Sequence, residues 1–185
     1  MASLELEARL DSLLSAAQEE TKDIDLFAPI AEREECPICL IPLPIKDNEI
    51  VFMPCCGKSL CAGCSYKRME TDHNCAFCRQ PTLSGTKQIK ALKKLMKKNV
   101  SGAFMMMGGF YKSGDSGVFQ SDTKALELFI RAAELGKPNA YGMIAKHYFD
   151  GRVVEQDVSK AIEYWEVATK KGSAGAHEEL AVLHR

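Results

Sequence analysis

Apolar residues recur at helical spacing through the second half of the chain, and this spacing predicts a series of amphipathic helices. From about residue 103 the sequence repeats itself with a period of 36 to 37 residues, and a third copy begins at Ala176. Repeats of this length are typical of helix pairs that stack into an α-solenoid. The residues that match between the first two copies are Tyr111 and Tyr148, Gly114 and Gly151, Ala125 and Ala161, Ala132 and Ala168, and Gly136 and Gly172.

Polar residues and glycines mark the expected ends of these helices. Each copy should divide after a Tyr-x-x-Gly segment, and its second helix should begin near an Asp or Ser that caps the free backbone amides. Gly136 and Gly172 are the expected C-terminal stops. The candidate N-terminal caps are Ser121, Asp122, Asp157 and Ser159.

The beginning of the chain predicts a further amphipathic helix over residues 4–20, followed by an acidic linker. Its apolar stripe consists of Leu4, Leu6, Leu10, Leu13, Leu14 and Ala17. We expect residues 1–31 to form a short helix that packs on its neighbour, together with the linker. A dimerising or partner-binding helix is the alternative, although the stripe is too short for a sustained coiled-coil seam.

Residues 85–101 predict a basic helix that links two parts of the chain. It carries six lysines, with Ile89, Leu92, Leu95 and Met96 along the other side. We interpret the lysines as a solvated face; the alternatives are an acidic partner, RNA or a nuclear-import signal. The segment has no aromatic residue for base stacking, which weakens the RNA hypothesis. The sequence leaves open whether this helix is a linker or the first half of a repeat.

The net charge and the lengths of the apolar runs indicate which partners and which compartment to expect. A formal net charge of -1 over 185 residues gives no global field that favours nucleic acid or an anionic membrane. No apolar run of about 18 residues predicts a membrane span, and the N-terminus lacks the features of a secretory signal. We therefore expect a reducing compartment, cytoplasmic or nuclear, in which thiols stay free.

All eight cysteines lie within residues 36–78. They form four pairs in chain order: Cys36 and Cys39, Cys55 and Cys56, Cys61 and Cys64, and Cys75 and Cys78. Eight thiols make two complete tetrahedral sets, which predicts two zinc ions. A disulfide-stapled secreted domain is the alternative, which the expected compartment disfavours. The segment is too short for a large core, so metal binding should supply much of its folding energy. Residues 50–52 predict a short strand, and a helix of about two turns should follow Cys64.

The cysteine segment resembles the all-cysteine variant of the RING finger. The resemblance rests on the spacing of the pairs, the proline after Cys36, the Cys-x4-Cys run from Cys56 to Cys61, and the Cys-x-x-Cys-Arg-Gln-Pro sequence at the end. The two zinc sites of that family interleave. The resemblance therefore implies one zinc ion on Cys36, Cys39, Cys61 and Cys64 and a second on Cys55, Cys56, Cys75 and Cys78.

One feature departs from the family, which separates its third and fourth ligands by at least one residue. Adjacent residues on an extended backbone point in opposite directions, so Cys55 and Cys56 can face one ion only if the backbone turns sharply there. The alternative is that His73 replaces one of them.

The resemblance also implies a function, that of a RING-type ubiquitin ligase. Such an enzyme holds a conjugating enzyme charged with ubiquitin and acts by orientation, without a covalent intermediate. No residue is then strictly catalytic, and Arg79 matches the position whose guanidinium orients ubiquitin and its carrier. The implied partner-binding residues are Ile38, Arg68, Met69, Ala76 and Arg79.

Two of these positions depart from the family, and two other functions stay open. Ala76 stands where a proline is usual, and Arg68 stands where a large apolar residue is common. The main alternative is a non-catalytic scaffold that binds proteins through the zinc module and the repeats. RNA binding through the lysine helix and the zinc knuckles is a third and weaker hypothesis, so nucleic acid and membranes are not expected partners.

The repeats resemble the Sel-one-like family, a relative of the tetratricopeptide repeat. The matching features are the Tyr-x-x-Gly turn, the Asp-x-x-Lys-Ala start of the second helix and the small residues before the closing glycine. The family implies that a concave face binds other proteins, here a substrate or an adaptor. The array has few copies and no obvious polar closing helix. Because solenoids need about three repeats and a cap, we expect its end to be ragged, completed by another molecule or truncated.

The expected fold is therefore a small zinc-stabilised α+β RING-type domain plus an all-α helical-repeat (α-solenoid) domain. The zinc-binding domain should occupy residues 32–84 and the basic linker helix residues 85–101. The repeats should occupy residues 102–185, as two copies and the start of a third.

Overall fold

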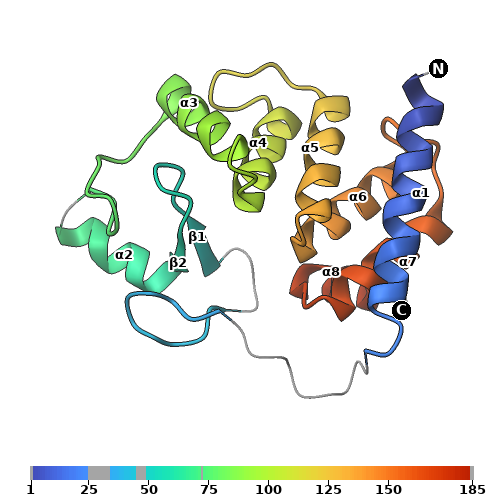
Figure 1. Ribbon diagram of the computed structural model, residues 1–185, viewed down its shortest axis with the longest axis horizontal. Helices are drawn as coiled ribbons and strands as arrows, with labels where there is room; N and C mark the ends of the chain where they lie inside the picture. Colours follow the sequence, from blue (N-terminus) through green and yellow to red (C-terminus); the bar gives the residue numbers. More distant parts are fainter. Residues whose placement is uncertain (1, 25–33, 45–48, 72, 184–185) are drawn as a thin grey trace.

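The computed structural model describes residues 2–24, 34–44, 49–71 and 73–183 of the chain, and these form a cysteine-rich module followed by a row of helices (Figure 1). A long N-terminal helix, α1 (Ala2–Glu20), precedes the module, which contains β1 (Ile50–Phe52), β2 (Ser59–Cys61) and α2 (Ala62–Thr71). The remaining helices are α3 (Gly85–Met96), α4 (Ser101–Ser113), α5 (Asp122–Glu134), α6 (Pro138–Asp150), α7 (Val158–Lys170) and α8 (Ala174–Leu183). None of the described helices is long and apolar enough to cross a membrane.

The predicted repeats form two stacked helix pairs, α4 with α5 and α6 with α7, and α8 begins a third pair. Both Tyr-x-x-Gly segments end a first helix as predicted, because Gly114 and Gly151 adopt left-handed φ values of 75° and 64°. In both repeats, the residue that ends the loop after the glycine forms a backbone hydrogen bond to the tyrosine. The amide of Ser121 donates to the Tyr111 carbonyl at 2.8 Å, and that of Asp157 donates to the Tyr148 carbonyl at 3.1 Å.

The capping residues of the second helices were partly predicted from the sequence. The side chains of Ser121 and Asp157 accept hydrogen bonds from the amides of Lys124 and Lys160, so both residues are N-caps. The other two candidates, Asp122 and Ser159, lie inside α5 and α7. Gly136 and Gly172 follow α5 and α7 with positive φ, as expected of C-terminal stops.

Small residues allow the paired helices to approach each other closely. A methyl group at Gly108 of α4 would lie 2.5 Å from Cε1 of Phe129 on α5, so the ring fills the space that this glycine leaves. Buried apolar residues from α4 to α8 then form one continuous core. This core holds the helix pairs together, as in other stacked repeats.

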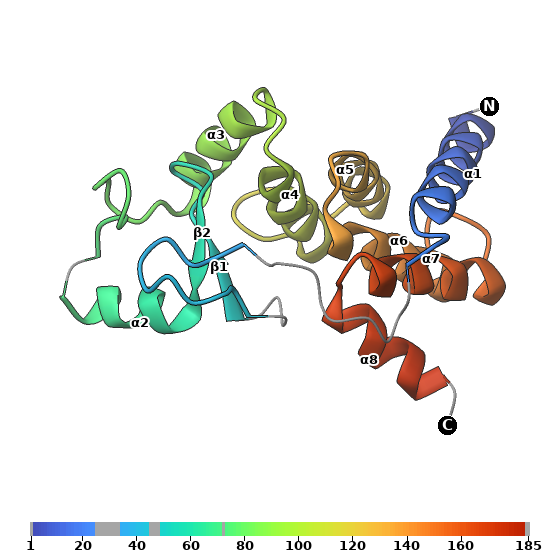
Figure 2. The same cartoon turned by 60° about the horizontal axis from the view of Figure 1, so that its bottom comes forward.

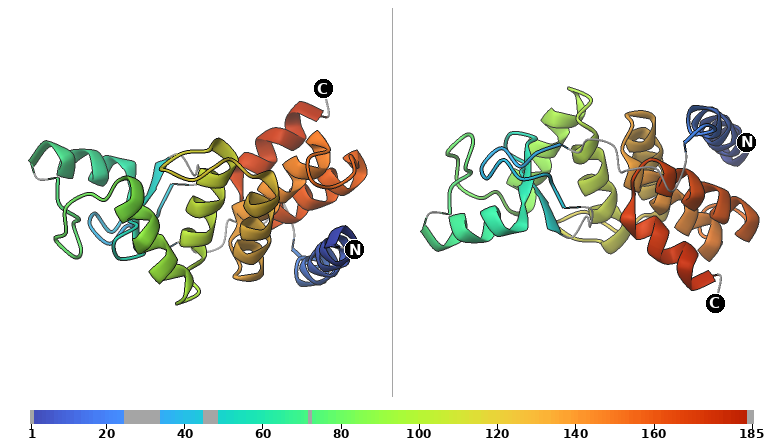
Figure 3. Two further views of the ribbon diagram at one scale, coloured as in Figure 1. Left: turned by 90° about the horizontal axis from the view of Figure 1, so that it is seen from above. Right: turned by 90° about the horizontal axis from the view of Figure 1, so that it is seen from below.

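The N-terminal helix packs on the repeats, which come much later in the chain. Leu10, Leu14 and Ala17 are buried in the core of the helix pairs, and α1 lies beside α7 (Figure 2). The hydroxyl of Tyr164 on α7 donates to the Leu10 carbonyl at 2.7 Å. Figure 3 shows α1 and α8 on opposite sides of α7. The helix therefore covers a face of the array that would otherwise expose apolar residues.

Exposed ion pairs surround this apolar contact. Lys160 approaches Asp11 to 2.6 Å, and Lys171 approaches Glu20 to 2.6 Å. Arg9 reaches Glu134 of α5 at 2.6 Å. Because exposed pairs contribute about 0–1 kcal/mol each, the buried leucines hold the helix and the charges align it.

The basic helix α3 joins the cysteine module to the repeats. Its Leu92 and Leu95 are buried in a small core with Ala103 and Met107 of α4, while all six lysines are exposed. Phe52 of β1 packs against the same core, and a methyl group at Gly102 would lie 2.6 Å from its Cε2 atom. The helix is thus amphipathic as predicted, and it packs on α4 as a further layer of the array.

Candidate metal centre

Two short loops of the cysteine module fold in the same way. The first loop runs from Cys36 to Leu40 and the second from Cys75 to Arg79. In each loop the backbone reverses between two cysteines, and the amide of the residue that follows the second cysteine donates to the carbonyl of the first. The Leu40 amide donates to the Cys36 carbonyl at 2.9 Å, and the Arg79 amide donates to the Cys75 carbonyl at 3.0 Å. Leu40 and Arg79 both have positive φ, 57° and 60°. Residues other than glycine rarely adopt this conformation, so a specific loop geometry is imposed at both places.

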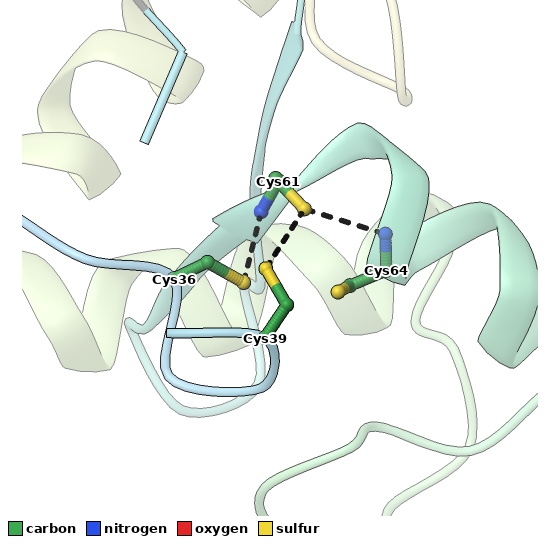
Figure 4. Close-up of side chains that lie close together, drawn as sticks. All are labelled: Cys36, Cys39, Cys61 and Cys64. Carbon is green, nitrogen blue, oxygen red and sulfur yellow. Dashed lines mark hydrogen bonds between the residues drawn. The ribbon is translucent and has the colours of Figure 1, made fainter. Parts of the chain in front are cut away.

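The strands and the following helix bring the third cysteine pair to the first loop (Figure 4). β1 and β2 are antiparallel, with Ile50 opposite Cys61, so Cys61 stands at the end of the hairpin. The helix α2 begins at the next residue and carries Cys64 in its first turn, earlier than the sequence suggested. The Cys61 amide donates to the Cys36 sulfur at 3.5 Å, and the Cys64 amide donates to the Cys61 sulfur at 3.4 Å.

The eight thiols gather into two separate sets. Within each set all four sulfur atoms lie within 4.8 Å of one another. One set is Cys36, Cys39, Cys61 and Cys64, and the other is Cys55, Cys56, Cys75 and Cys78. These are the same sets that the RING resemblance implied, and they interleave along the chain.

The spacing of the sulfurs suits a tetrahedral metal ion. The Cys39 and Cys61 sulfurs are 3.9 Å apart, and the Cys56 and Cys75 sulfurs are 3.7 Å apart. Four sulfurs at about 2.3 Å from a zinc ion would lie about 3.8 Å from one another, whereas a disulfide needs about 2.05 Å. The donor sets therefore fit a thiolate-bound divalent ion.

The adjacent cysteines both take part in the second set because the backbone turns at that point. The amides of Cys56 and Gly57 both donate to the Met53 carbonyl, at 3.3 and 2.8 Å. This turn brings the Cys55 and Cys56 sulfurs to the same side. His73 is exposed and does not belong to the group, and its carbonyl instead accepts the Thr82 hydroxyl at 2.6 Å.

Backbone amides make one thiol in each set unusually acidic. Burial alone would raise the pKa of Cys36, yet hydrogen bonds from the amides of Cys39, Cys61 and Ile38 outweigh it and lower that pKa to about 6. Burial likewise opposes ionisation of Cys75, and the amides of Cys78 and Phe77 lower its pKa to about 7. These amides are the donors that a metal-bound thiolate needs.

Three of the other thiols, those of Cys55, Cys56 and Cys64, have raised pKa values. Burial, followed by the neighbouring sulfurs of its own set, raises the pKa of Cys55. The Cys61 thiol is the main cause of the raised pKa of Cys64. Four thiolates crowded together repel one another, and a divalent cation would remove that repulsion and release protons.

The predicted partner-binding residues all lie in or beside the two cysteine loops and α2. Ile38 is 47% exposed and Met69 is 53% exposed, although both are apolar. Arg79 is exposed, and Ala76 lies in the second loop. Arg68 is partly buried and its guanidinium donates to the Asn74 carbonyl, so this side chain joins α2 to the second loop.

An apolar surface beside the first loop was missed in the sequence. Leu40 and Ile41 are 69% and 63% exposed. A shallow cavity of about 300 Å³ lies next to them, lined in part by Ile41, Pro42 and Pro44. The signal was the apolar run after Cys39, which has no periodicity and therefore indicated neither a strand nor a helix. Exposed apolar residues grouped beside Ile38 favour a protein-binding surface.

Comparisons with known proteins identify the helical array. The Sel1 repeat family model matches residues 105–137 and 138–173. A Sel1 repeat protein from Oxalobacter formigenes is 32% identical, with 53% of this chain and 40% of that chain covered and a TM-score of 0.49. The protective antigen c5321 of uropathogenic Escherichia coli, which displays an SLR fold, is 22% identical, with 56% and 22% covered and a TM-score of 0.51.

A third solved structure, the cysteine rich protein B of Helicobacter pylori, is 22% identical over 52% of this chain and 72% of that chain, with a TM-score of 0.48. The chain spans less than half the length of the first two proteins. Sel1-repeat proteins commonly mediate protein–protein interactions. Residues 105–173 of this chain are therefore two Sel1 repeats, as the sequence predicted.

Proposed function

We propose that the cysteine module holds two zinc ions and that the chain is a RING-type ubiquitin ligase. The observation that supports this most directly is the grouping of eight thiols into two interleaved sets of four, each with sulfur spacings that suit a tetrahedral ion. Cys36, Cys39, Cys61 and Cys64 would hold one ion. Cys55, Cys56, Cys75 and Cys78 would hold the other.

The zinc ions have a structural role in this proposal. Cysteine thiolates would fill all four positions around each ion and would leave no open position for a substrate or an activated water. Side chains of the module, rather than the ions, would then bind the conjugating enzyme. The exposed apolar side chains of Ile38 and Met69 offer a contact for the conjugating enzyme.

Arg79 is the candidate for orienting the attached ubiquitin. Its backbone is fixed by the hydrogen bond to Cys75, while its side chain is exposed. A guanidinium held in this way can bridge two protein surfaces with its planar set of donors. Rate enhancement would come from holding ubiquitin and the substrate lysine in a reactive pose. The Sel1 repeats would bind the substrate or an adaptor.

Ubiquitin chain formation tests the proposal. The full chain, loaded with zinc, is mixed with ubiquitin, ATP, activating enzyme and a panel of conjugating enzymes, and chains are followed on gels. We expect chain formation with at least one conjugating enzyme. The double variant Ile38→Ala, Arg79→Ala should reduce the rate roughly tenfold or more, because anchors at an interface centre typically contribute about 2 kcal/mol or more.

A control variant separates this effect from a general effect of surface change. Val182→Ala removes an apolar side chain that is 68% exposed on α8, far along the chain from the module, and should keep the full rate. Full activity of the double variant would count against the proposed surface. Binding of a conjugating enzyme without chain formation would favour the non-catalytic scaffold.

A further inference from the structure

The lysine face of α3 consists of four lysines on the helix and two in the turn that follows it: Lys87, Lys90, Lys93, Lys94, Lys97 and Lys98. Residues 73–114 contain Arg79 and seven lysines but no Asp or Glu, so this segment has a formal charge of +8. The whole chain has a charge of -1, so the remaining residues have a charge of -9. The near-neutral total therefore conceals a strongly basic middle segment between two acidic parts.

Within the described part of the chain, no carboxylate neutralises this face. All six lysines are exposed, and none forms an ion pair with a described residue. The repeats behave differently, because Lys146, Arg152, Lys160 and Lys171 each approach a carboxylate within 4.0 Å. Six like charges on about three helical turns repel one another, so a counter-charge from outside would be stabilising.

We propose that the lysine face of α3 binds an acidic segment of a partner protein. The face extends from Lys87 to Lys98, a length of about 17 Å at about 1.5 Å per residue. An acidic helix of about 11 residues, or an extended segment of about five, would span it. Leu92 and Leu95 anchor the other side of α3 on the repeats, so the face is presented on a fixed support.

The composition of the face favours a protein over a nucleic acid. The cations are lysines, which act as point charges and lack the planar fork with which arginine binds phosphates and bases. The segment from Lys87 to Lys98 also has no aromatic residue on which a base could stack. Carboxylates need neither of these features.

The position of α3 gives the acidic segment a role, and this role rests on the proposed ligase function. The helix follows directly after the second cysteine loop and packs against the same small core as Phe52 of β1. A protein held on this face would lie beside the cysteine module rather than at the far end of the repeats. Proteins with an acidic segment are therefore the substrate class that the lysine face would select.

Peptide binding tests this inference independently of ligase activity. A fluorescein-labelled peptide of ten glutamates is titrated with the zinc-loaded full chain, and fluorescence anisotropy is measured. We expect binding that weakens as the salt concentration rises from about 50 to about 200 mM, since exposed charges are screened over a Debye length of about 10 Å or less. Lys90→Glu with Lys94→Glu should weaken binding at least about tenfold, because both carboxylates would then repel the peptide.

A matched variant shows whether the position of the charges matters. Lys124→Glu with Lys170→Glu changes the net charge by the same amount but lies on α5 and α7, and it should bind the peptide as the unchanged chain does. Equal losses in the two variants, or no binding by the unchanged chain, would overturn the inference.

A single-stranded RNA of ten nucleotides that binds at least tenfold more tightly than the peptide would overturn it in favour of a nucleic acid. Salt-sensitive self-association that Lys90→Glu with Lys94→Glu abolishes would assign the face to a second copy of the chain. Peptide binding without ubiquitin chain formation would retain the docking site and reject the ligase.

Discussion

Removal of the proposed zinc ions is expected to unfold the cysteine module and leave the helices α5, α6 and α7 folded. The apolar core of the module is small, with five buried residues in the described chain: Cys36, Leu43, Met53, Leu60 and Cys75. Two of these are thiols that the zinc ions would hold. Structural zinc contributes about 10–16 kcal/mol of apparent binding free energy in small domains, far more than so few apolar residues supply.

Hydrogen exchange of the full chain, with and without a strong chelator, would measure this effect. We expect amides of β1, β2 and α2 to lose their protection, while those of α6 and α7 keep it. The repeats in the same molecule serve as the internal control. The variant Cys75→Ser should lose protection at the second cysteine loop even with excess zinc, since a hydroxyl is a poor zinc ligand. Unchanged protection of β1 and β2 in the chelator would show that the module folds without metal.

The second large effect should come from the N-terminal helix. Leu10 is fully buried against the repeats, so Leu10→Ala should lower the free energy of unfolding by about 2–5 kcal/mol, the usual cost of this change in a core. Leu4 lies on the same helix and is 71% exposed. Leu4→Ala should therefore change the stability by about 0.5 kcal/mol or less.

Urea unfolding followed by circular dichroism would compare the two variants. The same substitution in the same helix controls for helix propensity, so the difference reports the contact with the repeats. If both variants are as stable as the unchanged chain, α1 does not contribute to the repeat core. If Leu4→Ala has the larger effect, the helix packs in a different orientation.

The helical array was predictable from the sequence because its signals are local. The tyrosine–glycine turns and the Ser and Asp caps act within a few residues of where they appear, and the 36–37-residue period repeats them along the chain. The count of eight thiols indicated two sites, whereas the membership of each sulfur set came only from the family resemblance. The turn at Cys55 and Cys56 could be stated as a requirement, and the hydrogen bonds to Met53 show how the chain meets it.

The contacts that join the parts could not be predicted. Leu10 and Tyr164 are separated by more than 150 residues, and no short-range pattern records such a pairing. Glycine is an unfavourable residue in a helix, so the sequence gives no reason for Gly102 near the start of α4. The structure gives one, because the ring of Phe52 occupies the space that a side chain at this position would need. The charge of the whole chain likewise concealed the basic segment, because the acidic residues lie elsewhere in the sequence.

Metal content measured by native mass spectrometry shows whether the two cysteine sets bind zinc. The full chain is expressed in zinc-containing medium, exchanged into volatile buffer and weighed intact, then weighed again after acidification. We predict two zinc ions per chain, both lost in acid, when the thiols regain their protons. A chain without bound metal, or one whose mass shows cysteines joined to each other, would contradict it.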